Sequence, residues 1–360
     1  MKGRMIEIDG SQHSGSGTIV RQAIAFSALT GHAVHIRNAR SRRDKPGLRR
    51  QHIRVVQAIA DLVNGTADGL QEGSREMMFR PGRPLGGRRY HWDIGSAGST
   101  TMLALAVLPV LTFACQPTSV EIRGGVFQDF APSFFHLHHV MLPLFKRMGI
   151  EAEMRMERPG YVPRGEGQLA LHVTPVTHQL HHQTLVDRGA IQRLWGVALA
   201  SHLAARHVSE RMAESARRLL QSHGYDPEFQ IQNDTSAPQP GAALAVFVDC
   251  AGGARLGADR AGALGRPAEA IGQQVARQLL ADLETGAALD RFAADQIIPF
   301  AALAYGESRF SVPMMTDHMQ SSAWLAKVFL GADVKMTERQ LSIHGAGFIP
   351  RLESPAAGHK

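Results

Sequence analysis

The chain has 360 residues, of which 44% are hydrophobic, enough for two or three domains or for one domain carrying an insertion. Lys and Arg number 39 against 32 acidic residues, a basic excess that favours polyanionic partners. Cys115 and Cys250 are the only cysteines and lie far apart, which predicts a reducing compartment and excludes a cysteine metal site. The longest apolar tract, residues 102–114, is too short to cross a bilayer, so we expect a soluble, cytoplasmic protein with no membrane partner.

The first loop of the chain is rich in glycine and serine. Residues 9–21, DGSQHSGSGTIVR, follow a short strand at 5–8 and precede an apolar helix, a turn in which the backbone can approach an anion closely. Residues 94–101, IGSAGSTT, repeat this arrangement before an apolar helix at 102–111. The spacing matches neither a P-loop nor a dinucleotide fingerprint. Each loop alone is as typical of a tight structural turn as of a site, and together they favour a cleft lined by helix starts.

A basic segment lies between these two loops. Residues 40–52, RSRRDKPGLRRQH, contain six Lys or Arg and one acidic residue, Asp44. Pro46 suits the first turn of a helix, so we expect an amphipathic helix to begin there and to end at Gly65. Basic side chains around the positive end of a helix indicate a phosphate site. The alternative is a solvated basic loop.

Internal similarity predicts a repeated architecture. Pro46 to Gly65 and Pro267 to Gly286 have the same spacing and look like two copies of one helical unit. The end of a helix, a glycine and an alternating strand also recur three times, at residues 28–38, 147–157 and 329–344. We therefore expect βαβα-type units, each a small sheet with helices on one face.

The composition changes between residues 183 and 263. We expect helices at 191–203 and 209–223, a strand at 243–249 and a Gly/Ala/Arg-rich loop at 251–265. Because this block separates the two helical copies, it reads as a smaller domain inserted into the repeats.

The last part of the chain contains the most suggestive side chains. His318 follows a strand and begins a helix beside Asp317, a candidate cap of that helix. An imidazole that stays neutral can attack an activated phosphorus centre. Asp295 and Gln296 open an apolar segment, a position that suits a metal or ribose contact and equally a helix cap. The clusters at 136–139 and 178–182 show the ordinary roles of histidine in surface or packing, and they lack a third zinc ligand.

Taken together, these segments resemble the RNA 3′-terminal phosphate cyclase family, in the family's order and over nearly the whole chain. The resemblance rests on residues 8–21, 40–52, 94–101 with 107–111, 158–167, 294–304 and the His318 segment. It implies an α/β (α+β) fold of three repeated units, each a four-stranded sheet plus two helices, with a smaller inserted α/β domain. The implied divisions are residues 1–182 for the first two repeats, 183–265 for the insert, 266–345 for the third repeat and 346–360 for a C-terminal tail.

The resemblance also implies a reaction on RNA 3′-phosphate ends that uses ATP and a divalent cation, Mg²⁺ or Mn²⁺. The histidine matching His318 attacks the α-phosphate of ATP, and the bound AMP then passes to the RNA 3′-phosphate. The neighbouring 2′-hydroxyl displaces AMP and closes a 2′,3′-cyclic phosphate. Positive charge and a cation would stabilise these steps. By matching positions, phosphates would be held by Arg21, Arg40, Arg43, Lys45 and Gln51, and the nucleotide pocket lined by Phe292, Ala293, Ala294, Asp295 and Gln296.

Several positions depart from the family pattern. Ser14 and Thr18 replace a usual Glu and Gln, and the lost Glu is the carboxylate proposed to hold the metal, which leaves Asp295 with water as its replacement. Leu105 stands where many members have a nucleotide-contacting Gln, and Val126-Phe127 replaces Thr-Asp. Two alternatives to the enzyme therefore stay open: a non-catalytic RNA-binding protein, and an enolpyruvyl-transferase-like enzyme, since similar repeats build that fold.

Overall fold

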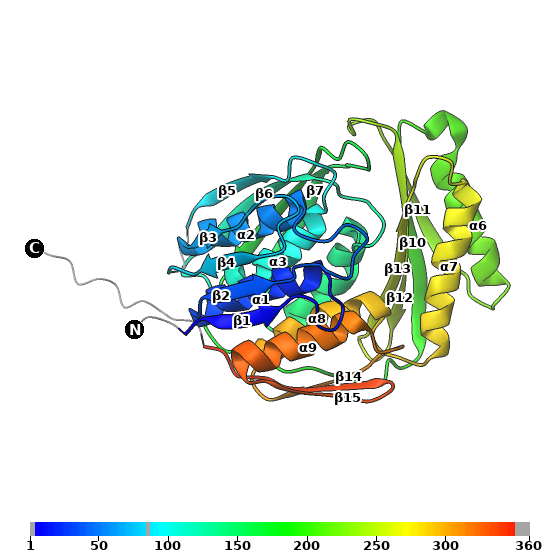
Figure 1. The fold of residues 1–360 in the computed structure, drawn as a ribbon. Coiled ribbons are helices and arrows are strands. Elements are labelled where there is room, and N and C mark those ends of the chain that lie inside the picture. Colours follow the sequence, from blue (N-terminus) through cyan, green and yellow to red (C-terminus); the bar gives the residue numbers. More distant parts are fainter. Residues whose placement is uncertain (1–3, 84–86, 350–360) are drawn as a thin grey trace, which may run out of the picture.

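The computed structural model describes residues 4–83 and 87–349, which form a mixed α/β fold on four separate four-stranded sheets (Figure 1). The expected fold class is thereby confirmed. Of the expected C-terminal tail, residues 350–360 lie outside the described part. Among the described residues, no helix combines the length and apolar character that crossing a membrane requires.

The first sheet shows how each unit is connected. Its strands run in the order β1 (Ile6–Asp9), β2 (Val34–Arg37), β4 (Met77–Arg80) and β3 (Thr66–Asp68). The β1–β2 pair is parallel and the other pairs are antiparallel. Helix α1 (Gly17–Thr30) connects β1 to β2, and α2 (Arg50–Val63) connects β2 to β3. A parallel pair needs such a crossover, because its strands run in the same direction.

The second and third sheets repeat this connectivity, with orders β5-β6-β8-β7 and β9-β14-β16-β15. In both, the first pair of strands is parallel. The second unit consists of β5 (Arg89–Asp93), α3 (Thr100–Thr112), β6 (Thr118–Gly124), α4 (Phe134–His136), a π-helical turn (Leu137–Met141), α5 (Leu142–Arg147), β7 (Glu151–Arg158) and β8 (Gly167–Thr174). The third consists of β9 (Thr184–Leu185), α8 (Arg291–Leu303), β14 (Glu307–Ser311), α9 (Asp317–Leu330), β15 (Asp333–Met336) and β16 (Gln340–His344).

The fourth sheet is inserted between β9 and α8, and its order is β11-β10-β12-β13. Helices α6 and α7 pack against each other on its outer side, away from the other three sheets (Figure 1). Its elements are β10 (Ile191–Ser201), a 3₁₀ turn (Ala204–Arg206), α6 (Val208–Gln221), β11 (Glu228–Asp234), β12 (Gly241–Cys250), β13 (Arg255–Ala261) and α7 (Ala268–Glu284).

The insert corrects two expectations. Residues 191–203 were expected to be helical, but 191–201 form β10, a central strand paired with β11 and β12. The stretch 251–265 was expected to be a loop and contains β13. The two errors have different causes. Strand β10 is buried on both faces and has no polar alternation, so its apolar run at 194–201 cannot be distinguished from a helix by its period. The sequence of β13, RLGADRA, is rich in residue types that are uncommon in strands, so its composition favoured a loop. The expected strand at 243–249 and the helix at 209–223 are confirmed with small shifts in their ends.

The structure also corrects the expectation that the helices after Pro46 and Pro267 are two copies of one unit. Helix α2 begins at Arg50, not at Pro46, and its left-handed cap is Asn64 rather than Gly65. The second copy, α7, packs on the inserted sheet, so the two helices occupy different positions in the topology. The helix–glycine–strand pattern does hold, since Gly31, Gly149 and Gly331 all have positive φ before the next strand. The predicted division of the chain into domains stays a prediction, although β9 pairs with β14 and so joins the third sheet.

The helices of the three repeated units face one another inside the molecule, with the sheets outside (Figure 1). Helices α1, α3, α8 and α9 pack together there. Helix α3 is apolar on all sides, and every residue of it except Met102 is buried, as its central place requires.

Candidate active site

A cavity of about 630 Å³ opens where the three repeats and the insert meet. The first turns of α1, α2, α8 and α9 reach it, so the free amides of several helix starts lie around one space. The loops at 97–98 and 127–132, Val162 and the 262–263 segment of the insert complete the wall. The expected cleft lined by helix starts is therefore present. Its polar lining comes from Ser16, Thr18, Arg21, Arg40, Arg43, Gln51, His52, Gln128, Asp129, Asp295, Gln296 and His318.

His318 lies in the first turn of α9. The cap of this helix is Thr316, whose hydroxyl accepts from the Met319 amide at 3.1 Å, and not Asp317 as expected. The His318 Nδ1 atom lies 3.0 Å from the Thr18 hydroxyl and 3.4 Å from the Ser16 hydroxyl. These contacts leave Nε2 as the ring nitrogen without a protein partner among the residues described.

The electrostatic surroundings keep this ring neutral. Burial lowers the pKa of His318 below its usual 6.5, and the nearby cations of Arg21 and Arg43 lower it further. A neutral imidazole has the free electron pair that a nucleophile needs.

Three arginines form the cationic wall of the cavity. Burial, with Arg40 and Arg43 nearby, lowers the pKa of Arg21 to about 10. Burial also lowers the pKa of Arg40, again with help from Arg43. Within residues 4–83 and 87–349, none of the three lies within 4.0 Å of a carboxylate. Like charges held together without counterions indicate a site for an anion.

The rest of the basic segment supports this wall. The Arg40 guanidinium donates to the carbonyls of Lys45 and Gly47, at 2.9 and 2.6 Å. Lys45 itself is exposed and does not line the cavity. Gln51 accepts from the Ser99 amide at 3.2 Å and so ties the first turn of α2 to the second Gly-rich loop.

Helix α8 presents one face to the cavity. Phe292, Asp295 and Gln296 line it, as their spacing along a helix predicts, whereas Ala293 and Ala294 are fully buried in the core. Asp295 lies inside α8 and not at its start, because the cap is Asp290. Burial raises the pKa of Asp295 to about 7, although a hydrogen bond from Thr316 opposes the shift.

A buried His–Asp pair fixes the start of this helix. His136 Nε2 lies 3.0 and 3.1 Å from the carboxylate oxygens of Asp290, and both side chains are fully buried. Asp290 also accepts from the amides of Gly257, Phe292 and Ala293 at 2.9, 2.9 and 2.8 Å. The pair joins the second repeat, the insert and α8. From the sequence, His136 was assigned an ordinary packing role, and nothing in the sequence indicates a partner 154 positions away.

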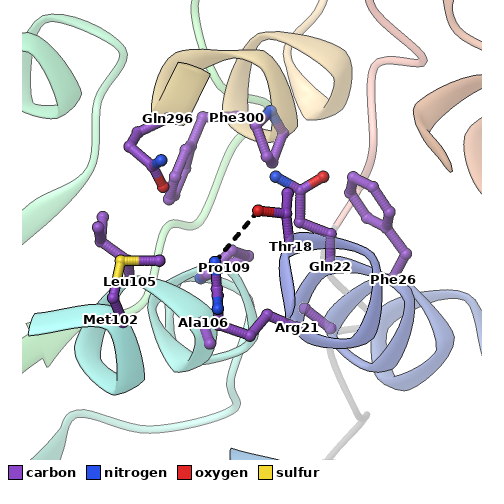
Figure 2. A pocket seen from close by; sticks show the side chains of 12 residues that line it. Thr18, Arg21, Gln22, Phe26, Met102, Leu105, Ala106, Pro109, Gln296 and Phe300 are labelled. Atoms are coloured by element: carbon purple, nitrogen blue, oxygen red, sulfur yellow. Dashed lines mark hydrogen bonds between the residues drawn. The ribbon is translucent and has the colours of Figure 1, made fainter. Parts of the chain in front are cut away.

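Ser14 and Leu105, two positions expected to depart from the family pattern, both lie near the first turn of α1. Ser14, which replaces the usual Glu, does not line the cavity but bonds to Ser321 of α9 at 2.7 Å and to Ser16 at 3.0 Å. Leu105 lines a small apolar hollow of about 30 Å³ between α1, α3 and α8, next to Thr18 and Arg21 (Figure 2). The larger cavity shares several residues with this hollow.

The carboxylates of the cavity limit what metal it could hold. No group of three or more His, Cys, Asp or Glu suited to a metal ion occurs in the described part of the chain. Asp129 is engaged by Arg266 at 2.7 Å and by Arg260 at 3.6 Å, which leaves Asp295 as the other lining carboxylate. One carboxylate suits an Mg²⁺ ion that keeps water and substrate phosphates as its remaining ligands.

Known proteins match this chain over nearly its whole length. The family model described as RNA 3′-terminal phosphate cyclase matches residues 12–336. A protein named RNA 3′-terminal phosphate cyclase from Hyperthermus butylicus is 40% identical and covers 93% of this chain and 94% of its own. The protein of the same name from Staphylothermus marinus is 35% identical and covers 96% of this chain and 99% of its own.

A solved structure, the enolpyruvyl transferase NikO from Streptomyces tendae, covers 97% of this chain and 50% of its own at 11% identity and a TM-score of 0.41. A likeness at that level carries no weight for the function. The match across almost the whole length and the identities of the relatives lead to one conclusion: the chain belongs to the RNA 3′-terminal phosphate cyclase family.

Proposed function

We propose that this protein converts an RNA 3′-phosphate to a 2′,3′-cyclic phosphate at the expense of ATP, through His318. The observation that carries the proposal is a neutral imidazole beside three arginines that have no carboxylate partner in the described structure. Phosphates supply the missing counter-charge, and the ring supplies the nucleophile.

In the first step, the Nε2 electron pair of His318 forms a bond to the α-phosphorus of ATP, and the bond to the β-phosphate oxygen breaks. Pyrophosphate leaves and AMP stays on the ring. Thr18 positions the ring, because its hydroxyl lies 3.0 Å from Nδ1 and also accepts from Arg21 at 3.2 Å. With both donors on this oxygen, the Nδ1 proton is held there and the Nε2 pair faces the substrate.

In the second and third steps, an oxygen of the RNA 3′-phosphate takes the AMP from His318, and the adjacent 2′-hydroxyl then displaces AMP. The ring is restored and the cyclic phosphate is released. Arg21, Arg40 and Arg43 would hold the phosphates, and Phe292, Asp295 and Gln296 would contact the nucleotide. Lys45 would act through its carbonyl, which accepts from Arg40.

A divalent cation, when bound, would neutralise charge that develops on the phosphates. Asp295 fits this role as a single carboxylate ligand, and a cation beside it would lower its pKa from about 7.

Ser14 favours a second candidate, a non-catalytic protein that binds RNA ends, because the family's metal-holding carboxylate is missing at this position. Labelling with ATP that carries radioactive α-phosphate, together with Mg²⁺ or Mn²⁺, separates the two. We expect acid-labile AMP on the wild type and none on His318→Ala, whereas His344→Ala, which changes an exposed histidine of β16, should label normally.

Absence of label in the wild type at every cation concentration would favour the binding protein. Ser14→Glu extends the test, since a gain of label in that variant would show that the missing carboxylate limits the natural protein.

A further inference from the structure

A second hollow of about 790 Å³ adjoins the cavity. Val162, Gly262 and Ala263 line both spaces, so the two share a wall made by the second repeat and the insert. An RNA strand whose 3′-phosphate lies among the arginines extends beyond the cavity, and this shared wall is a path that it can follow.

Phe130 stands at the cavity with its ring in solvent. It is 97% exposed, whereas Phe127 and Phe134 of the same segment are buried at 1% and 9%. The neighbouring aromatic rings of this segment therefore pack into the hydrophobic core, whereas the Phe130 ring does not. An exposed ring beside a phosphate-binding cavity has the form of a stacking platform for a nucleobase.

The loop around Phe130 is firmly held. Asp129 accepts from the Arg266 guanidinium at 2.7 and 3.1 Å, and the Pro132 carbonyl accepts from Thr101 at 2.7 Å. Phe130 itself has φ of +66°, a conformation that costs a non-glycine residue about 1 kcal/mol or more. The ring thus gains little from the fold, while the backbone that carries it is held before any ligand arrives, which lowers the entropic cost of stacking.

The second hollow offers both an apolar and a cationic contact. Leu264 is fully exposed and Val162 is 58% exposed. Among the arginines that line it, Arg211 is paired with Glu269 and Arg266 with Asp129. Arg206 is exposed and has no carboxylate within 4.0 Å in the part of the chain described here.

We propose that the nucleotides immediately 5′ of the terminal phosphate bind along this wall, with one base stacked on Phe130 and a backbone phosphate at Arg206. This inference rests on the proposed function, because it takes RNA as the ligand of the cavity. It makes Phe130 a residue that selects polymeric RNA ends over mononucleotides, without reading their sequence.

The test measures the affinity for a short fluorescent oligoribonucleotide ending in a 3′-phosphate, by anisotropy and without ATP. We expect Phe130→Ala to weaken binding roughly 5- to 100-fold, as loss of one stacked base does. Phe130→Trp should bind as the wild type does, and Tyr305→Ala, which removes another exposed aromatic ring outside both hollows, should have no effect. Arg206→Gln should lower the slope of log Kd against log salt by about 0.7.

The contrary outcomes are distinct. Unchanged RNA affinity in Phe130→Ala, with Phe130→Trp also unchanged, would overturn the inference. So would a rise in the ATP concentration needed for half-maximal His318 labelling without loss of RNA affinity, because the ring would then contact ATP. If the wild type never labels but Phe130→Ala still loses RNA affinity, the proposed reaction fails and the RNA path stands.

Discussion

The cavity arginines and the buried His136–Asp290 pair hold charge in opposite ways. Asp290 is fully buried, yet each of its oxygens is matched by donors from His136 or from backbone amides. Burial lowers the pKa values of Arg21 and Arg40, and repulsion from the neighbouring arginines lowers them further. Arg21, Arg40 and Arg43 have no carboxylate partner among the described residues.

This difference distinguishes charged groups that stabilise the fold from charged groups that are left free to bind a ligand. A buried charge whose donors are complete stabilises the arrangement of the elements that supply them. A cluster of cations without counterions lowers the stability of the fold, and a bound anion offsets this loss of stability. The same contrast appears for single arginines: Arg266 is saturated by Asp129, whereas Arg43 faces the cavity without a counterion in the described structure.

The largest effect is expected on the saturated side. Asp290→Ala leaves His136 without its partner and removes the cap of α8, so we expect the free energy of unfolding to fall by about 3–5 kcal/mol. Urea or guanidinium denaturation measures it. Asp333→Ala, which removes an exposed carboxylate of β15, should change stability by less than about 0.5 kcal/mol.

A denaturation midpoint for Asp290→Ala equal to that of the wild type would contradict the assigned role. The pair would then be dispensable for joining the insert to α8, although Gly257 and Phe292 both donate to it.

The next prediction compares the loss of an arginine without a carboxylate partner with the loss of an arginine that has one. Arg43→Gln removes a cation that has no partner to lose, so its stability should stay within about 0.5 kcal/mol of the wild type. Its affinity for ATP should fall roughly 10- to 100-fold, since a charge-assisted contact to phosphate is worth about 1.5–3 kcal/mol. Calorimetric titration of ATP in a His318→Ala background gives the affinity without turnover.

Arg266→Gln should show the reverse pattern. Its two bonds to Asp129 are lost, so we expect stability to fall by about 1–3 kcal/mol while ATP affinity changes less than in Arg43→Gln. If both variants lose ATP affinity equally, the contrast between open and saturated arginines is wrong.

Part of the fold and of the candidate site could be predicted from patterns of residues that are adjacent in the chain. The two Gly/Ser loops and the basic segment predicted a cleft lined by helix starts, because each depends on residues adjacent in the chain. That this cleft binds phosphate stays a prediction. The repeated sheets were predicted for the same reason, since Gly31, Gly149 and Gly331 end helices by a local backbone conformation.

What the sequence could not predict depends on contacts between distant segments. Strand β10 looked helical because side chains on both of its faces are buried over residues 194–201, so the run has no polar alternation. Helix α2 begins at Arg50, four positions after Pro46, because residues 46–49 are used to hold Arg40 and the Gly73 segment. Asp295 was interpreted as a possible cap, but the cap is Asp290, whose carboxylate accepts from the Phe292 and Ala293 amides. The distant partner of Asp290, His136, could not be read from the sequence.

The smallest predicted effect concerns the pH dependence of labelling. The pKa of His318 lies below its unfolded value of 6.5, through burial and then through Arg21 and Arg43. The neutral ring therefore contributes stability above pH 6.5, and this contribution is lost as pH falls through the folded-state pKa. At ATP concentrations well below saturation, where the rate reports the pKa of the free protein, the labelling rate should stay constant down to below pH 6.5 and then decline as the ring takes up a proton. In Arg43→Gln the midpoint of this decline should move toward pH 6.5, because one repelling cation is gone. The control is Arg155→Gln, which changes an exposed residue that does not line the cavity and should leave the midpoint in place. A midpoint that stays in place in Arg43→Gln would mean that Arg43 does not act on the ring, and the unpaired arginines would then serve phosphate binding alone.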